Sequence, residues 1–171
     1  ILLLALFPLL LLIIILIILI DGKPIFFIQN RPGYKNKIFK LIKFRTMKNS
    51  IVKNDVQRIT KLGKFLRNSS LDELPELINV LKGEMSFVGP RPLLEEYLNY
   101  YSKDQIKRHD CLPGITGLAQ INGRNKLTWN KKFEYDLEYL NNINFINDMK
   151  IIIKSILIIF QFKNINSDNK K

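Results

Sequence analysis

The sequence predicts an α/β protein, mainly helical with a small β-hairpin, whose N-terminal helix attaches it to a membrane. Three observations support this class. Residues 1–20 are entirely apolar, residues 24–47 contain two strand-like runs, and most of the remaining chain spaces its apolar residues as helices do. We therefore divide the chain into a membrane helix over 1–20, a globular domain over 21–163 and a polar tail over 164–171.

The apolar run from Ile1 to Ile20 is long enough to span a bilayer, because a helix rises about 1.5 Å per residue and the hydrocarbon layer is about 30 Å thick. A cleaved signal peptide, the alternative, has a shorter apolar region that ends in small residues. Pro8 removes a backbone donor, so we expect a kink near Ala5–Pro8. A kinked helix either crosses the bilayer or re-enters it as a hairpin, and both arrangements stay open here.

Basic residues dominate the segment after this run, where Asp21 is the one acid beside Lys23, Arg31, Lys35, Lys37, Lys40, Lys43, Arg45 and Lys48. Positive charge beside a membrane segment predicts that the globular part is cytoplasmic. The whole chain has 27 basic and 15 acidic residues, a net charge of +12. Such a charge favours anionic partners, namely nucleic acid, phosphorylated metabolites or acidic lipid headgroups.

Two strands are expected over 24–29 and 38–47, and the turn-rich segment NRPGYKNK between them predicts a β-hairpin. Two helices should follow over 59–68 and 70–82, and Gly83 suits the C-terminal cap of the second. The apolar face of this second helix is expected to comprise Leu71, Leu74, Leu77, Ile78 and Leu81.

Three further helices are expected, over residues 92–108, 127–140 and 148–162. Pro92 suits the first helical position, because the amide that proline lacks is unpaired there anyway. The last helix is very apolar but carries Lys150 and Lys154. It fits either core packing or a position in the membrane surface.

His109 and Cys111 are the single histidine and the single cysteine of the chain. The single cysteine excludes an internal disulfide and a cysteine-based zinc site. The single histidine argues against a Ser-His-Asp triad, an HExxH zinc site and a phosphoryl relay through paired histidines. An enzyme with this composition works mainly with carboxylates, Lys, Arg and a hard cation such as Mg²⁺.

The adjacent acids Asp72 and Glu73 have two interpretations. In the structural one, Ser70 and Glu73 form a capping box, and Asp72 lies at the positive end of the helix dipole. In the functional one, the pair lies among phosphate-binding cations, namely Lys43, Arg45, Arg67 and Arg91. Adjacent helical residues point about 100° apart, so one acid would attack while the other handled a proton or a metal ion.

Three long motifs occur in order along the chain: KFRTM (43–47), LRNSSLDELPELINVLKGEMSFVGPRPL (66–93) and LPGITGLAQINGRN (112–125). With the apolar N-terminus and DGKPIFFIQNRPG (21–33), they resemble the bacterial sugar transferase family, the monotopic polyprenol-phosphate phosphoglycosyl transferases. The resemblance runs from about Phe7 to about Ile159, and the chain length resembles the short-form members.

The resemblance implies a phosphoglycosyl transferase that moves a sugar-1-phosphate from a UDP-sugar to undecaprenyl phosphate, releases UMP, requires Mg²⁺ and initiates lipid-linked glycan assembly. It implies that Asp72 is the nucleophile of a covalent phosphosugar intermediate. Glu73 would assist deprotonation of the lipid phosphate, and both acids would bind Mg²⁺. The substrate-binding residues are expected to be Lys43, Arg45, Arg67, Arg91, Gln120 and Arg124.

The resemblance also implies amphipathic interface helices and a re-entrant membrane helix, broken at a Ser-Pro pair, at the cytoplasmic face of the bacterial inner membrane. Here the pair reads Phe7-Pro8. It lacks the hydroxyl that satisfies carbonyl groups freed by a kink, although the kink itself is still expected.

A rival interpretation is a non-catalytic, basic, membrane-anchored protein that binds acidic lipid or nucleic acid, as the charge of +12 allows. It predicts salt-sensitive binding that does not depend on Asp72. We favour the enzyme, with a UDP-sugar, undecaprenyl phosphate and membrane lipid as partners and no nucleic acid. It explains why carboxylates and cations occur in one ordered set of motifs. A polytopic transferase is a further alternative, but it needs several apolar spans.

Overall fold

The computed structural model describes residues 2–48, 55–123 and 126–160. Its α-helices and strands follow one another as α1 (Leu2–Ile20), β1 (Phe26–Pro32), β2 (Ile38–Phe44), α2 (Asp55–Arg58), α3 (Lys61–Asn68), α4 (Glu76–Leu81), β3 (Ser86–Val88), β4 (Gly114–Thr116), α5 (Leu118–Ile121), α6 (Trp129–Asn141) and α7 (Phe145–Phe160). Short 3₁₀ helices form η1 (Tyr34–Asn36), η2 (Leu71–Glu73), η3 (Glu95–Tyr100) and η4 (Gln105–Asp110). The described chain is therefore mostly helical with two small sheets, which confirms the predicted α/β class and adds one sheet to the single predicted hairpin.

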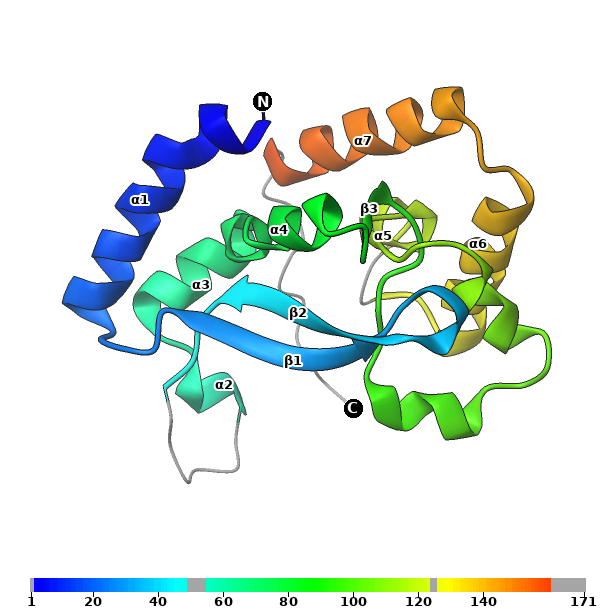
Figure 1. Cartoon of the computed structure of the whole chain (residues 1–171), viewed down its shortest axis with the longest axis horizontal. Coiled ribbons are helices and arrows are strands. Elements are labelled where there is room, and N and C mark those ends of the chain that lie inside the picture. Colours follow the sequence, from blue (N-terminus) through cyan, green and yellow to red (C-terminus); the bar gives the residue numbers. More distant parts are fainter. Residues whose placement is uncertain (1, 49–54, 124–125, 161–171) are drawn as a thin grey trace.

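The hairpin of β1 and β2 crosses the middle of the molecule (Figure 1). Helices α3 and α4 lie along one side of it, α1 stands at one end, and α6 lies toward the other end (Figure 1). Helix α7 runs along the top of the view, on the same side of the hairpin as α4 (Figure 1). The predicted tail over 164–171 lies outside the described residues.

Helix α1 contains Pro8 and bends toward its N-terminal end (Figure 1). Its stretch Leu3–Ile20 is the one described segment that is long and apolar enough, by length and composition, to cross a membrane. Ile13 and Ile17 are buried against the globular part, whereas Leu4 and Leu19 are more than three-quarters exposed. One stripe of the helix thus packs on the domain and the rest presents apolar surface outward.

The C-terminal end of α1 is tied to the domain by polar contacts. Arg45 Nη2 donates to the carbonyl oxygens of Asp21 and Gly22, each at 2.6 Å. Thr60 Oγ1 donates to Asp21 Oδ2 at 2.8 Å. Beneath these contacts, Ile13 and Ile17 form one apolar cluster with Phe44 and Leu66. The cation satisfies carbonyl groups left free at a helix C-terminus and suits the helix dipole.

The predicted hairpin is confirmed. β1 and β2 are antiparallel, with a register from Phe26 opposite Phe44 to Pro32 opposite Ile38. The fully buried Asn79 of α4 hydrogen-bonds to the backbone of β2: its Nδ2 donates to Lys40 O at 2.8 Å, and Ile42 N donates to its Oδ1 at 3.2 Å. Because a free strand edge leaves backbone groups unpaired, this side chain fixes α4 beside β2.

The helix predicted over 70–82 is wrong as one element, because Pro75 interrupts it. Proline has no amide hydrogen and its ring clashes with the preceding turn, so the chain forms η2, a break, and then α4. The expected capping box at Ser70 is also wrong. Ser70 has left-handed backbone angles (φ 56°) and its side chain makes no capping hydrogen bond.

The predicted apolar face of this region is only partly the buried one. Leu77 is buried, but Ile78 is 36% and Leu81 is 76% exposed, while Glu76 and Asn79 point inward. The interruption at Pro75 changes the phase of the helix relative to a continuous one, so spacing counted from Leu71 fails after the break.

The predicted cap at Gly83 is confirmed. Gly83 has φ +72°, its amide donates to Val80 O at 3.0 Å, and Glu84 N donates to Asn79 O at 3.0 Å. These two bonds form the Schellman arrangement that commonly ends a helix at a left-handed glycine.

A second sheet, which the sequence did not predict, pairs β3 and β4 in parallel, with Ser86 opposite Gly114 and Val88 opposite Thr116. The chain after β3 therefore runs close beside the start of β4. A Cβ on Gly89 would lie only 2.3 Å from Leu112 O, so this close approach requires glycine.

The helix predicted over 92–108 is also wrong: two 3₁₀ helices, η3 and η4, take its place, and Pro92 precedes both. Ser102 and Gln105 explain the division, because each accepts a hydrogen bond from the backbone amide of the other, at 3.0 and 3.2 Å. Such local side-chain bonds compete with a continuous helix.

Helices α6 and α7 confirm the two predicted C-terminal helices. Thr128 caps α6 by accepting from Lys131 N, and α7 begins earlier than expected, at Phe145. Tyr139 and Ile151 bury against Val88 of β3. The outward side of α7 is apolar and exposed, at Phe145, Ile146, Met149, Ile153, Ile156 and Leu157.

Candidate active site

Four segments bring their charged side chains together around Glu73. Its Oε1 accepts from Lys43 Nζ at 2.7 Å and from Arg91 Nη2 at 2.6 Å. Lys43 extends from β2, and Arg91 lies in the loop after β3. Lys43 Nζ also contacts Glu76 Oε1 of α4 at 3.0 Å. The structure thus brings together the predicted residues Lys43, Glu73 and Arg91. It adds Glu76, an acid that was not predicted at the site.

Local structure explains how the two adjacent acids reach this place. The left-handed turn at Ser70 ends α3, and η2 is a single 3₁₀ turn that stops before Pro75. Asn79 anchors the following α4 to β2, which also carries Lys43. The acids therefore sit at the edge of a rigid hairpin.

Glu73 is held as a carboxylate. Burial alone would raise its pKa, but the positive charges of Arg91 and Lys43, and the hydrogen bonds from both, outweigh burial and hold the pKa well below its usual range. In return, the charge of Glu73 raises the pKa of Arg91. At neutral pH Glu73 therefore stays ionised between the two cations and is poorly suited to take up or release a proton.

Asp72 differs from its neighbour. No described side chain donates a hydrogen bond to its carboxylate, although Lys43, Arg91 and Arg67 are near enough to act on its charge. Burial and then the charge of Glu73 raise the pKa of Asp72 to about 6, against the opposing effect of these cations. A half-buried carboxylate with unused lone pairs, beside cations, is suited to attack an electrophilic phosphorus.

Glu76 is a residue that sequence analysis missed. It is 2% exposed, and burial followed by the charge of Glu73 raises its pKa to about 7. Its spacing from Asp72 was no usable signal, because the break at Pro75 interrupts the helix that would have placed the two acids on one side. Apolar periodicity obscured it, since a buried acid was not expected on that face.

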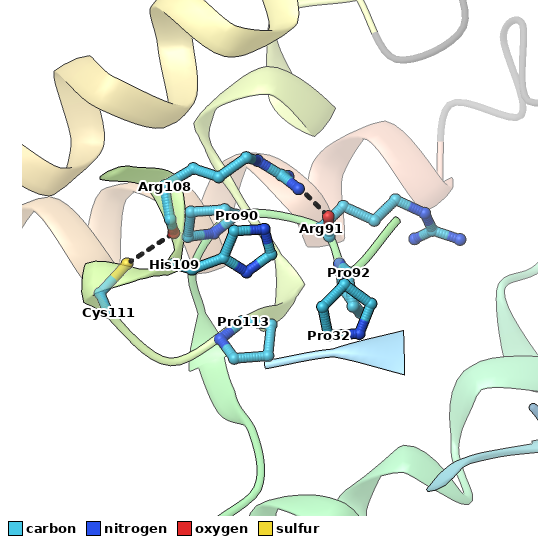
Figure 2. Close-up of a pocket in the computed structure, with 8 residues that line it drawn as sticks. All are labelled: Pro32, Pro90, Arg91, Pro92, Arg108, His109, Cys111 and Pro113. Atoms are coloured by element: carbon cyan, nitrogen blue, oxygen red, sulfur yellow. Dashed lines mark hydrogen bonds between the residues drawn. The ribbon is translucent and has the colours of Figure 1, made fainter. Parts of the chain in front are cut away.

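The backbone beside Arg91 is held from two sides. Arg108 Nη2 donates to Arg91 O at 2.7 Å, and Arg31 Nη1 donates to Pro92 O at 3.3 Å. Figure 2 shows Arg108 reaching the Arg91 carbonyl, while the side chain of Arg91 extends away from the pocket. The pocket itself is lined by Pro32, Pro90, Arg91, Pro92, Arg108, His109, Cys111 and Pro113 (Figure 2).

A buried ion pair supports this arrangement from α6. Arg108 Nη2 lies 2.7 Å from Asp136 Oδ2, and both side chains are almost fully buried. Sequence analysis missed Arg31, Arg108 and Asp136, because their contacts join segments that are distant along the chain. The loop of Arg91 is thereby preorganised, while the Arg91 side chain stays 44% exposed.

Three other predicted residues lie outside the hydrogen-bonded cluster. Arg67 Nε donates to Thr46 Oγ1 at 2.7 Å, but its charge still reaches Asp72. Arg45 is occupied at the end of α1. Gln120 of α5 donates to Ile115 O at 3.0 Å, and its buried Oε1 has no partner in the described chain.

The substrate-binding roles of all these residues stay predictions, and Arg124 lies outside the described residues. Within the described ranges, no group of three or more His, Cys, Asp or Glu side chains is arranged to hold a metal ion. Asp72 and Glu73 still fit Mg²⁺, which usually keeps several waters and binds one or two carboxylates together with substrate phosphates.

His109 and Cys111 are structural. His109 Nδ1 lies 3.2 Å from Gly33 O, and burial followed by the charge of Arg108 lowers its pKa to about 4. Burial raises the pKa of Cys111 to about 11, so its thiol is not activated.

The fold and the site define a class of protein: a small α/β domain with one apolar N-terminal helix and a carboxylate–cation cluster of the kind that handles phosphorylated substrates. The chain belongs to the bacterial sugar transferase family, whose model matches residues 1–162.

Individual relatives agree with this assignment. The chain is 53% identical over 137 residues to the "Uncharacterized sugar transferase EpsL" of Bacillus subtilis (strain 168), covering 77% of this chain and 67% of that protein. It is 41% identical over 168 residues to the "UDP-glucose:undecaprenyl-phosphate glucose-1-phosphate transferase" of Xanthomonas campestris pv. campestris, covering 88% of this chain and 34% of the relative.

A third relative is the "Undecaprenyl-phosphate galactose phosphotransferase" of Salmonella typhimurium (strain LT2), 36% identical over 164 residues. That similarity covers 82% of this chain and 34% of the relative. The chain therefore spans 34% of each of the last two proteins and 67% of the Bacillus one.

Proposed function

We propose that this protein transfers a sugar-1-phosphate from a UDP-sugar to undecaprenyl phosphate and releases UMP, through a covalent phosphosugar–aspartate intermediate on Asp72. The observation that carries the proposal is the contrast between the two acids. Asp72 accepts no hydrogen bond from any described residue, whereas its neighbour Glu73 accepts one from each of two cations. The names of the Xanthomonas and Salmonella relatives support undecaprenyl phosphate as acceptor, and the first also supports a UDP-sugar donor.

In the first step, an Asp72 oxygen attacks the phosphorus that carries the sugar. The bond from this phosphorus to the bridging oxygen breaks, and the electron pair leaves with UMP. Lys43, Arg91 and Arg67 are the cations available to neutralise the phosphate charge. In the second step, a phosphate oxygen of the lipid attacks the same phosphorus, and the Asp72 carboxylate is released. The two substrates then use one site in turn.

For Glu73 we propose that it orients Lys43 and Arg91 toward the transferring phosphate and shares Mg²⁺ with Asp72. Bound there, Mg²⁺ supplies additional neutralisation of phosphate charge. The family resemblance also assigns Glu73 a part in deprotonating the lipid phosphate. Its lowered pKa makes it a weak base, so the positioning role is the one that its contacts favour.

We further propose that the domain works at the cytoplasmic face of the bacterial inner membrane, with α1 embedded as a kinked or re-entrant helix. The exposed apolar surface of α1 and the apolar outward side of α7 support membrane contact at both elements. Lys150 and Lys154 lie on α7, where they suit acidic headgroups.

Labelled UDP-sugar without lipid acceptor tests the covalent step. The wild-type protein should release UMP and retain label on the protein, whereas Asp72→Asn and Asp72→Ala should do neither, because they lack an anionic nucleophile. Addition of undecaprenyl phosphate should discharge the label. Full UMP release by purified, folded Asp72→Ala would refute the proposal.

The rival function, a basic membrane-anchored binding protein, makes the opposite prediction for the same assay. It expects no UMP release from any of several UDP-sugars, and lipid binding that is unchanged in Asp72→Ala. A binding protein of this kind would have no role for Asp72 or for the ordered carboxylate cluster around it.

A further inference from the structure

The surroundings of Arg91 contain two cations that the proposed reaction has not yet used, Arg31 and Lys132. The inference drawn from them rests on the proposed function, because it concerns how the phosphates of the donor are held. Both lie near Arg91, one on β1 and the other on α6.

Arg31 approaches from the end of β1. Its Nη1 donates to Pro92 O at 3.3 Å, directly after Arg91, and its Nη2 donates to Gln29 Oε1 at 2.6 Å. Its Nε is buried and has no partner in the described residues. A guanidinium has five N–H donors, so each terminal nitrogen of Arg31 keeps one N–H beyond the bond that it makes.

Lys132 approaches from α6, one helical turn before Asp136, so both side chains lie on the same side of this helix. Asp136 binds Arg108, which in turn donates to the Arg91 carbonyl, and this places the turn of Lys132 beside the Arg91 loop. The Lys132 side chain makes no hydrogen bond or ion pair with another described residue. Its Nζ lies 4.6 Å from the centre of the Trp129 ring.

Aromatic residues lie near both cations. Trp129 packs on Tyr97 with ring centres 5.2 Å apart, and Tyr97 and Tyr101 both contribute to the electrostatic surroundings of Arg31. Burial and then the charge of Arg91 lower the pKa of Arg31 and likewise that of Lys132. Like charges gathered from separate elements oppose one another unless an anion lies between them.

We infer that Arg31, Arg91 and Lys132 form a binding site for the nucleotide phosphate of the donor, the phosphate that leaves as UMP. Carboxylates border this site at Glu73, which pairs with Arg91, at Glu76, which acts on Arg31, and at Asp136, which acts on Lys132. Arg91 is nevertheless the strongest charge acting on both Arg31 and Lys132. As the bridging bond breaks, negative charge grows on the departing phosphate. Cations fixed at that position stabilise the charge where it develops.

Lys131 and Lys132 are a matched pair for testing this site. Lys131 is exposed and binds Glu134 on the outer side of α6, so Lys131→Gln changes composition and charge as Lys132→Gln does without touching Arg91. In the Asp72→Asn background, which cannot turn over, calorimetry would measure the Kd of UMP. We expect Lys132→Gln and Arg31→Gln to weaken UMP binding about tenfold and Lys131→Gln to leave it unchanged, since a charged hydrogen bond is lost only in the first two.

Steady-state kinetics in the otherwise wild-type protein separates the two sources of phosphate. Lys132→Gln should raise KM for the UDP-sugar and leave KM for undecaprenyl phosphate unchanged. A rise confined to the lipid KM would overturn the assignment to the nucleotide, and equal behaviour of Lys132→Gln and Lys131→Gln would overturn the site. Unfolding midpoints of the two variants should agree, and Lys132→Arg should restore UMP binding.

The proposed function fails separately. It is refuted if the wild-type protein gives no UMP release that depends on Asp72, whatever the Lys132 variants do. If that release is present and the two lysine variants bind UMP equally, only the nucleotide-phosphate site is wrong.

Discussion

The cluster around Glu73 and the ion pair of Arg108 with Asp136 are both buried or half-buried, yet they differ in balance. Arg108 and Asp136 match one cation to one carboxylate, and the spare donor of Arg108 binds a backbone carbonyl. Around Glu73, by contrast, Lys43 contacts both Glu73 and Glu76, Arg91 contacts Glu73, and Asp72 lies nearby without an ion pair. The balanced pair is suited to hold a loop in place. The unbalanced cluster leaves Asp72 unpaired and its neighbours with shifted pKa values, which is typical of a reactive site.

The largest expected effect is on the unbalanced cluster. Glu73→Gln removes the charge that orients both Lys43 and Arg91, so UMP release should fall about 100-fold or more, the scale of losing one preorganised electrostatic group. Initial rates at saturating UDP-sugar measure it. The unfolding midpoint should also fall, because the ion pairs with Lys43 and Arg91 are lost, so rates are compared for folded protein only. Activity within about twofold of wild type would contradict the positioning role of Glu73.

Asp136→Asn attacks the balanced pair and should act mainly on stability. It leaves the Arg108 guanidinium buried without a counter-charge, which costs about 3–5 kcal/mol when a buried pair is broken. Urea unfolding in detergent measures the loss. A stability within about 1 kcal/mol of wild type would show that water or another group compensates Arg108, and would weaken the distinction between the two regions.

Glu76→Gln tests the imbalance through pH. In the folded protein Glu76 keeps its proton up to a pKa of about 7, whereas the unfolded chain loses it near 4.5. Its contribution to stability is therefore fully present below pH 4.5 and is lost as the pH rises through 7. The glutamine variant lacks this loss. Its stability relative to wild type should increase by about 1–2 kcal/mol between pH 5 and pH 8, measured without Mg²⁺; a constant difference would contradict the raised pKa.

The smallest effect is expected at His109, beside the balanced pair. Its pKa is lowered to about 4 in the folded protein, so the unfolded chain binds a proton first as the pH falls below 6.5. Stability from this group is present above pH 6.5 and is lost toward pH 4. The difference in stability between pH 7 and pH 5.5 should be smaller in His109→Gln by about 1 kcal/mol. Equal differences in the two proteins would show that His109 is protonated in the fold.

Prediction from sequence succeeded where the determining residues are neighbours. The hairpin, the cap at Gly83 and the helix that begins after Thr128 depend on turn chemistry and local hydrogen bonds. It failed at Ser70, where the capping-box pattern was present but Pro75 disrupted the helix that it would cap. It also missed the β3–β4 pair, because parallel pairing joins segments that carry no local turn signal.

The site divides in the same way. The motifs predicted that Lys43 and Arg91 lie near the two acids, and both contact Glu73. Nothing in the local sequence shows which of the two acids they bind. Glu76 and Asp136 were missed, because an acid in a helix is usually exposed and only its packed surroundings reveal otherwise. Arg45 shows what spacing leaves out: it alternates with Lys43 along the chain, yet its guanidinium is held by the end of α1, and its substrate-binding role stays a prediction.

By itself, the sequence determined the apolar helix, the hairpin, the glycine cap and the presence of two adjacent acids among cations, since each is a property of composition or of short spacing. Only the tertiary structure decided that Glu73 is the paired acid and Asp72 the unpaired one. The reason is physical: the partners of Glu73 lie 30 and 18 residues away along the chain, and the burial and charges that shift each pKa come from helices and strands that meet only after folding.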